Sequence, residues 1–279
     1  MNQNITKAIL PLAALSCVHG KMLAQDAARP NILYIMCDDH AMQAISAYGS
    51  PISKLAPTPN IDRLAQRGML FRNCFVENSL STPSRACLMT GLYSHQNGQR
   101  QLAEGIDTTK TFVPELMQKA GYETGIVGKW HMMCRPKGFD YYHILDGQGK
   151  YYNPNFCTTG NYGKYKQEMG YATTLTTQHA IEFLDHRQKD KPFCLYVHHK
   201  APHRSWFAEP KHIGMYDGVD FPLPKTFWDN YENRGSAAKT QKMNIEKDME
   251  LILDFKIPEL LDTSDVESMA SYAGLMGEL

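Results

Sequence analysis

The sequence predicts an α/β fold in which helices flank a doubly wound, mixed and mainly parallel sheet. Short apolar runs alternate along the chain with segments of helical periodicity, which is the pattern of repeated strand–helix–strand units. The run at residues 31–37 is apolar at nearly every position, as expected of a strand that is buried on both faces of a parallel sheet. With 279 residues, the chain is long enough to bury a sizeable core.

The first part of the pattern contains two strands and one helix. Residues 31–37 form a continuous apolar run that ends at Asp38, and they predict a strand buried on both faces. Residues 59–68 predict a helix, because their apolar residues share one face and Gly68 is a stop signal. Residues 69–76 then predict a second strand.

Two further helix–strand pairs follow. Residues 112–120 predict a helix that ends at Gly121 and leads to a strand over residues 124–128. A third helix, from about residue 174 to 184, precedes a strand over residues 192–198.

Two regions depart from this alternation. Residues 147–165 are rich in glycine and tyrosine and predict a long irregular connection. Residues 236–255 mix charged and apolar side chains, and from Thr263 an amphipathic pattern predicts a helix that reaches Leu279 without a cap or stop signal. We therefore expect the chain to end within an element.

The composition excludes two classes of partner. Lysine and arginine together number 29, as do aspartate and glutamate. No overall field attracts nucleic acid or an anionic membrane surface, so a local cluster of cations has to gather any anionic ligand. The seven cysteines show no Cys-x-x-Cys spacing, which argues against a cysteine zinc site and leaves disulfide pairing open.

Residues 1–24 have the features of a signal peptide. Lys7 precedes an apolar run over residues 8–18 that is too short to span a membrane, and the small residue Ala24 suits cleavage. We therefore expect an exported protein, periplasmic or secreted, with no membrane span. Cys17 lies in a poor lipoprotein signal, so lipid anchoring is the less favoured alternative.

Polar residues that follow the predicted strands are candidate site residues, because ligands of such sheets bind beyond the carboxyl ends of the strands. Asp38 and Asp39 bring two carboxylates together, which favours a hard cation such as calcium or magnesium; a solvated turn is the alternative. Lys129 and His131 place a fixed charge beside an imidazole that moves protons near neutral pH. His203 follows the last strand.

The most specific motif begins at Ser81. Residues 81–85 read Ser-Thr-Pro-Ser-Arg, and by themselves they also fit the start of a helix with Pro83 in its first turn and Ser84 as its cap. Residues 81–91 as a whole resemble the modification signature of type I sulfatases. Further motifs occur in the order that sulfatases use, at residues 29–32 with Asp38 and Asp39, 58–65, 121–131 and 201–203.

The resemblance to type I sulfatases implies a sulfuric ester hydrolase with an alkaline phosphatase-like fold. In that family the first residue of the motif, here Ser81, is oxidised to formylglycine, whose hydrate attacks sulfur. Asp38, Asp39 and the modified Ser81 would hold calcium. Arg85 would steady the hydrate by its charge.

The resemblance also assigns the other site residues. Lys129 would bind the sulfate, His131 would take a proton from the hydrate so that sulfate leaves, and His203 would contact the sulfate or the leaving oxygen. Residues 147–154 and 224–229 further resemble bacterial glycan sulfatases, including N-acetylglucosamine-6-sulfatase-like members, which implies a sulfated carbohydrate substrate. Serine in place of cysteine at position 81 implies an anaerobic-type, radical-SAM maturase as a partner.

The sequence departs from the family downstream of residue 206. Sulfatases normally carry an Asp-Asn pair that completes the calcium shell and a further lysine on the sulfate, in a region after Leu279. Asp229 and Asn230 follow no apolar strand, so we interpret them as a loop. We therefore expect residues 25–279 to be the N-terminal portion of a sulfatase catalytic domain, incomplete at its C-terminus and with little or no turnover.

Two alternatives stay open. A phosphoester or phosphonate hydrolase of the same superfamily shares the metal-bearing strand end and can share the formylglycine motif. A degenerate, non-catalytic glycan-binding protein would keep Ser81 unmodified.

Overall fold

The computed structural model describes residues 29–257, 261–264 and 266–278. The chain divides into two units, Met1–Pro30 and Asn31–Leu279, and the fold described below is that of the second unit. The predicted signal peptide of residues 1–24, with Cys17, lies outside the described residues.

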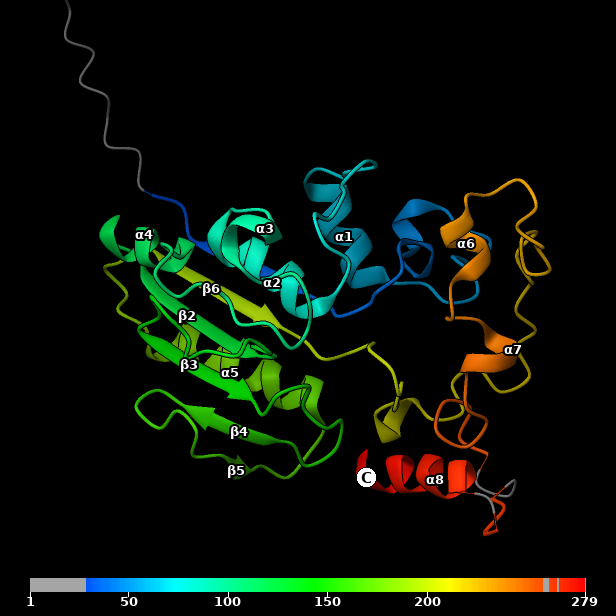
Figure 1. The fold of residues 1–279 in the computed structure, drawn as a ribbon. Helices are drawn as coiled ribbons and strands as arrows, with labels where there is room; N and C mark the ends of the chain where they lie inside the picture. Colours follow the sequence, from blue (N-terminus) through cyan, green and yellow to red (C-terminus); the bar gives the residue numbers. More distant parts are fainter. Residues whose placement is uncertain (1–28, 258–260, 265, 279) are drawn as a thin grey trace, which may run out of the picture. The chain divides into compact units, whose positions relative to one another are not determined.

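A six-stranded sheet forms the centre of this unit. Its strands are Ile32–Met36 (β1), Glu123–Gly128 (β2), Tyr141–Leu145 (β3), Asn155–Thr158 (β4), Lys166–Gln167 (β5) and Phe193–His198 (β6). They lie in the order β1-β6-β2-β3-β4-β5 (Figure 1). The strands from β1 to β3 in that order pair in parallel, and β4 and β5 are added antiparallel. The predicted mixed, mainly parallel sheet is confirmed.

Helices connect and flank these strands. The α-helices are Pro59–Arg67 (α1), Ser81–Thr90 (α2), Ser94–Asn97 (α3), Val113–Lys119 (α4), Ala172–His186 (α5), Ser236–Thr240 (α6), Ile245–Asp248 (α7) and Val266–Glu278 (α8). Short 3-10 helices span Met42–Ala44, Ser46–Tyr48 and Pro210–His212. The helices predicted near residues 59–68, 112–120 and 174–184 correspond to α1, α4 and α5, and the expected C-terminal helix to α8.

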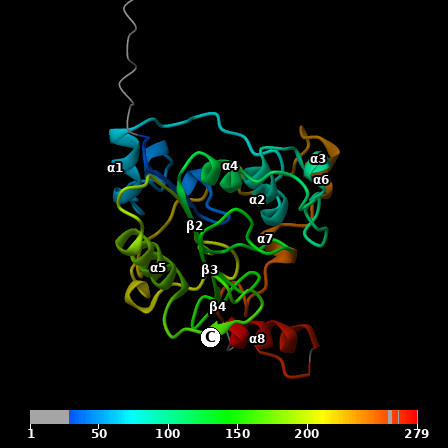
Figure 2. The same cartoon turned by 90° about the vertical axis from the view of Figure 1, so that its left-hand side faces the viewer.

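The central strands are covered on both faces, as Figure 2 shows with α5 on one side of β2 and β3 and with α2 and α4 on the other. Alternate residues of β6 belong to two hydrophobic clusters, one on each face of the sheet. Phe193 and Leu195 pack in one cluster with Phe183 of α5. Tyr196 belongs to the opposite cluster, which contains Met89 of α2. Both faces of β6, which forms the strand predicted at residues 192–198, are therefore buried.

Two predictions about strands are wrong. Residues 69–76 contain no strand, and Met69 and Phe75 are 75% and 84% exposed. An isolated apolar segment does not become a strand without a neighbour to receive its hydrogen bonds, and the described strands pair elsewhere. The second error concerns burial. β1 forms as predicted, but Leu33 and Ile35 are 49% and 53% exposed because β1 is an edge strand that pairs with β6 alone within the described residues.

Two further expectations from the sequence concern membrane-spanning helices and cysteines. None of the helices described there is long and apolar enough to cross a membrane. The six cysteines of the described part are all free thiols, and Cys87, Cys157 and Cys194 are buried. Cys157 and Cys194 belong to the apolar core.

Candidate active site

Three neighbouring strands bring the predicted residues to one edge of the sheet. β1 ends two residues before Asp38, β2 ends next to Lys129, and β6 ends shortly before His203. Because β6 lies between β1 and β2 and all three run in parallel, their carboxyl ends meet. Two backbone hydrogen bonds fix this edge: Asp38 N donates to Ala201 O over 3.2 Å, and Lys129 N donates to His198 O over 2.7 Å.

Ser81 is the first residue of α2 and faces this edge. Its Oγ lies 3.1 Å from Nδ1 of His131, which follows β2. The helix begins at Ser81 with Leu80 in the N-cap position, so Pro83 lies in the first turn and Ser84 is not the cap. The motif therefore begins at the first residue of α2, and the first turn of this helix holds Ser81 beside the imidazole of His131.

Arg85 lies one turn further along α2 and is almost completely buried, with 1% of its side chain exposed. Its Nη1 donates to the backbone carbonyl of Lys129 over 2.7 Å and to Nδ1 of His198 over 3.0 Å. Its Nη2 lies 3.6 Å from Oδ2 of Asp38. Nε and Nη2 have no hydrogen-bond partner within the described residues. A buried guanidinium with uncommitted donors is suited to hold an anion.

Lys129 is fully buried beside the same carboxylate. Its Nζ donates to Oδ2 of Asp38 and to Oε1 of Gln148. Burial lowers the pKa of Lys129 to about 8, and the charge of Asp38 opposes this shift while Arg85 adds to it. One buried carboxylate thus faces two buried cations, which leaves a net positive charge at this point.

His131 carries a neutral imidazole at pH 7. Burial lowers the pKa of His131 to about 4, and the nearby charges of Lys129 and Arg85 add to the effect. His131 has a φ of 46°, in the left-handed region that non-glycine residues rarely adopt. Such strained backbone conformations cluster at functional sites, where they fix the direction of a side chain. A neutral imidazole aimed at Ser81 is able to accept a proton.

The remaining predicted residues lie at the rim of the site. Asp39 is exposed, with a φ of 59°, and its Oδ2 is 3.7 Å from Nε2 of His203. Asp38, Asp39 and Ser81 line one pocket of about 270 Å³. Their side chains offer hard oxygen atoms, the donors that calcium prefers, so this set fits calcium in donor type.

Three residues that the sequence did not single out as site residues belong to this edge. Gln148 accepts from Lys129, and it lies within residues 147–154, the segment that resembles bacterial glycan sulfatases. His198 is fully buried and accepts from Arg85. Lys200 is 3% exposed, and its charge contributes to the lowered pKa of Lys129. His199, between His198 and Lys200 in the chain, is half-buried.

Asp229 and Asn230 lie in a loop, as predicted. Asp229 accepts from Nη2 of Arg234 over 2.9 Å and from the backbone N–H of Tyr231 over the same distance. Asn230 is exposed. Its side-chain oxygen accepts from the backbone N–H of Glu232, so both side chains stabilise their own turn.

Comparison with known proteins agrees with this geometry. The sulfatase family profile matches residues 30–279. The chain is 44% identical over 263 residues to an N-acetylglucosamine-6-O-sulfatase of Bacteroides thetaiotaomicron, which covers 92% of this chain and 46% of that protein. It is 30% identical over 268 residues to the human N-acetylgalactosamine-6-sulfatase, which covers 82% of this chain and 48% of the relative. The chain thus spans about half the length of these curated relatives.

Solved structures share the fold. A protein in complex with its substrate D-glucosamine-2-N,6-O-disulfate superposes with a TM-score of 0.79 and 42% identity, over 90% of this chain and 52% of that one. The phosphonate monoester hydrolase of Agrobacterium radiobacter, at 18% identity and a TM-score of 0.56, resembles it in fold alone, over 90% of this chain and 57% of that one. The family profile extends over the entire sheet and over every residue of the edge described above, and the chain belongs to the sulfatase family.

Proposed function

We propose that this chain carries the sulfate-binding and nucleophile-bearing part of an exported sulfuric ester hydrolase. The observation that carries the proposal is the grouping of Ser81 with a neutral His131 and with the buried cations Arg85 and Lys129. A sulfate ester develops negative charge on its oxygens as it reacts. Fixed cations in a buried site stabilise that charge, and in such sites this stabilisation usually accelerates the reaction more than any other single effect.

Each of these residues has a distinct role in the proposal. The free donors of Arg85 and the ammonium group of Lys129 bind the sulfate oxygens. His131 accepts a proton at the nitrogen that faces Ser81. His203, at the rim beside Asp39, contacts the sulfate or the leaving oxygen.

Two groups complete the proposed chemistry. Oxidation of Ser81 to formylglycine supplies a hydrated aldehyde as the nucleophile, and an anaerobic-type maturase is the partner that performs it. Asp38, Asp39 and the modified Ser81 hold calcium, which adds positive charge beside the sulfate. The oxygen donors that line the pocket support this assignment.

We propose a sulfated amino sugar, with a 6-O-sulfate on an N-acetylglucosamine-type ring, as the substrate class. The support is the similarity to the Bacteroides N-acetylglucosamine-6-O-sulfatase and to the structure bound to a glucosamine disulfate. Export to the periplasm or beyond the cell follows from the signal peptide that the sequence predicts.

The proposal is tested with the protein co-expressed with an anaerobic-type maturase. Mass spectrometry of the Ser81 peptide is expected to show the loss of two hydrogens. Release of inorganic sulfate from N-acetylglucosamine 6-sulfate is then measured under single-turnover conditions, with protein in excess. Single-turnover conditions detect slow chemistry, and they are needed because the sequence predicts little or no turnover. Ser81→Ala is expected to release none.

Two outcomes contradict the proposal. Faster cleavage of N-acetylglucosamine 6-phosphate than of the 6-sulfate would favour the phosphoester hydrolase. A Ser81 peptide that stays unmodified after co-expression with an active maturase would favour the non-catalytic glycan-binding protein. Expression without the maturase is the control that separates missing modification from missing chemistry.

A further inference from the structure

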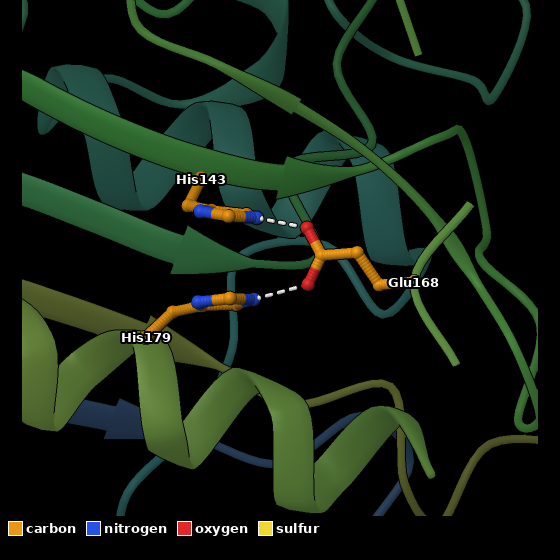
Figure 3. A group of neighbouring side chains, drawn as sticks. All are labelled: His143, Glu168 and His179. Atoms are coloured by element: carbon orange, nitrogen blue, oxygen red, sulfur yellow. Dashed lines mark hydrogen bonds and ion pairs between the residues drawn. The ribbon is translucent and has the colours of Figure 1, made fainter. Parts of the chain in front are cut away.

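A second cluster of titratable side chains lies at the other side of the sheet, in β3, just after β5, and in α5. Figure 3 shows that the imidazoles of His143 and His179 both point at the carboxylate of Glu168. The His143 Nε2 lies 2.6 Å from one carboxylate oxygen, and the His179 Nε2 lies 2.7 Å from the other. None of these residues lines the pocket of Ser81.

We propose that His143, Glu168 and His179 form a binding site for a divalent transition-metal ion of the zinc type. One potential ligand atom from each residue lies within 4.8 Å of the other two. Two imidazole nitrogens and one carboxylate oxygen are a donor set that zinc takes in proteins, with a fourth position left for water.

The contacts of His179 match those of a metal-binding histidine. Its Nε2 faces Glu168, and its Nδ1 lies 3.0 Å from a carboxylate oxygen of Glu182. With a metal at Nε2, the N–H at Nδ1 would donate to Glu182. Such an outer carboxylate orients most metal-binding histidines.

The rings are held in place before any ion binds. His143 and His179 stack with their centroids 3.5 Å apart and their planes at 15°. Phe156 of β4 meets both rings with its edge, at 5.0 and 5.2 Å. The histidine side chains are only 12% and 9% exposed. Both side chains are therefore already ordered, and the rings have to tilt so that the two Nε2 atoms converge on one ion.

Glu168 provides access to the ion and room for it. Ligand atoms around a tetrahedral zinc lie about 3.3 Å apart, because each bond is about 2.0 Å long. The carboxylate therefore has to retreat by roughly 0.6 Å from its present contacts. Its side chain is 28% exposed and has three rotatable bonds, so this movement is open to it. A bound ion would join β3, the segment after β5 and α5, and so fasten the antiparallel edge of the sheet to its covering helix.

The test uses the 279-residue chain, made metal-free by dialysis against a chelator, and zinc as the probe. Isothermal titration is expected to show one zinc ion per chain. Zinc-edge X-ray absorption of the wild-type complex is expected to show two imidazoles and a light oxygen ligand. Sulfur ligands in that spectrum would place the ion on the exposed thiols of Cys37 and Cys74 and overturn the proposal.

Variants locate the ion and do not depend on sulfatase activity. His143→Gln and His179→Gln are expected to abolish binding. Glu182→Gln, which changes an exposed outer residue, is expected to weaken affinity about 10- to 100-fold. His186→Gln, on the same helix, is the control and is expected to bind as the wild type does.

Two results reject the proposal. The first is no binding by the wild-type protein, which would leave a hydrogen-bonded triad alone. The second is equal binding by wild type and His179→Gln. Circular dichroism of each variant checks that the fold is retained.

Discussion

At the scale of single residues, buried charge defines the candidate active site. Asp38 and Lys129 are 91 positions apart in the sequence and form an ion pair with almost no exposure of either side chain. Arg85 joins them from α2. A buried excess of positive charge is unfavourable unless an anion neutralises it. Arg85 and Lys129 therefore lower the stability of the fold when no ligand is bound, and they favour the binding of sulfate.

Replacing Lys129 tests this electrostatic role. Lys129→Met keeps the length of the side chain and removes the charge beside Asp38. Single-turnover release of sulfate is expected to fall about 10²- to 10³-fold, the usual effect of removing one stabilising group from such a site. Ser81 modification is expected to be unchanged. Lys150→Ala, which changes an exposed lysine in the following loop, is the control. Equal losses in the two variants would contradict the role of Lys129.

The burial of His198 makes the free energy of unfolding depend on pH. Burial lowers the pKa of His198 well below its usual 6.5, and the charge of Arg85 adds to the effect. The unfolded chain takes up a proton below pH 6.5, whereas the folded chain does not. The free energy of unfolding therefore falls as the pH drops through this range.

His198→Asn should remove this dependence, because the amide oxygen is able to accept from Arg85 without titrating. Between about pH 7.5 and pH 5.5, the wild type is expected to lose about 1 kcal/mol more than the variant. Urea unfolding at the two pH values measures the difference. Parallel losses in both proteins would mean that other groups account for the pH dependence.

At the scale of elements, the end of β2 depends on a glycine. Gly128 has a φ of 86°, and a Cβ added there would lie 2.1 Å from the carbonyl oxygen of His198. This close approach allows Lys129 to donate its N–H to the same carbonyl. The edge that carries the site thus requires that β2 and β6 meet without a side chain between them.

Gly128→Ala is expected to destabilise the protein by about 3 kcal/mol or more, because strain at positive φ adds to a clash with backbone. Gly147→Ala is the matched control. Gly147 also has a positive φ, but its Cβ would meet no atom within 4 Å, so a cost of about 1–2 kcal/mol is expected. Urea unfolding compares the two. Equal costs would show that conformational strain alone is responsible.

At the scale of the whole described unit, Arg204 links the segment after β6 to the C-terminal region through ion pairs with Glu250 and Asp254. Arg204 donates from Nε and from Nη2 to the two oxygens of Asp254, both over 2.6 Å. The Asp254 side chain is fully buried, whereas Arg204 is 35% exposed. Two parallel hydrogen bonds fix both position and orientation, so this pair anchors a region that holds few buried apolar residues.

Asp254→Asn is expected to loosen this region. Trypsin should cleave after the exposed Lys239 and Lys242 about 10-fold faster, which corresponds to a loss of about 1.4 kcal/mol in local stability. Limited proteolysis followed by mass spectrometry measures the rates. Glu232→Gln, an exposed change in a neighbouring loop, is the control. Unchanged cleavage in Asp254→Asn would show that other contacts hold the region.

The sequence predicts local structure well where a segment contains its own signal. The run at residues 192–198 is apolar at nearly every position, and residues 124–128 contain Ile126 and Val127. Both runs form strands with both faces buried. The helix of residues 59–68 has its own apolar face and stop signal and forms α1. Residues 69–76 show the limit of such signals, because a strand also needs a partner that local sequence does not reveal.

The sequence by itself determined the strand–helix alternation, the family resemblance and the residues that would follow the strand ends, because parallel strands leave their carboxyl ends at one edge. Only the tertiary structure decided which groups meet there. It pairs Lys129 with Asp38 and Gln148, buries His198 against Arg85, and leaves β1 exposed at the edge.

The tertiary structure alone also brings together the residues of the proposed zinc site. His143, Glu168 and His179 have no motif spacing, and they approach because β3 pairs with β4 and α5 packs across the sheet. Distances between side chains depend on strand order and helix packing, which involve residues far apart in the chain. Sequence patterns reveal periodicity and local signals, whereas the chemistry of a site also requires the three-dimensional contacts that the fold creates.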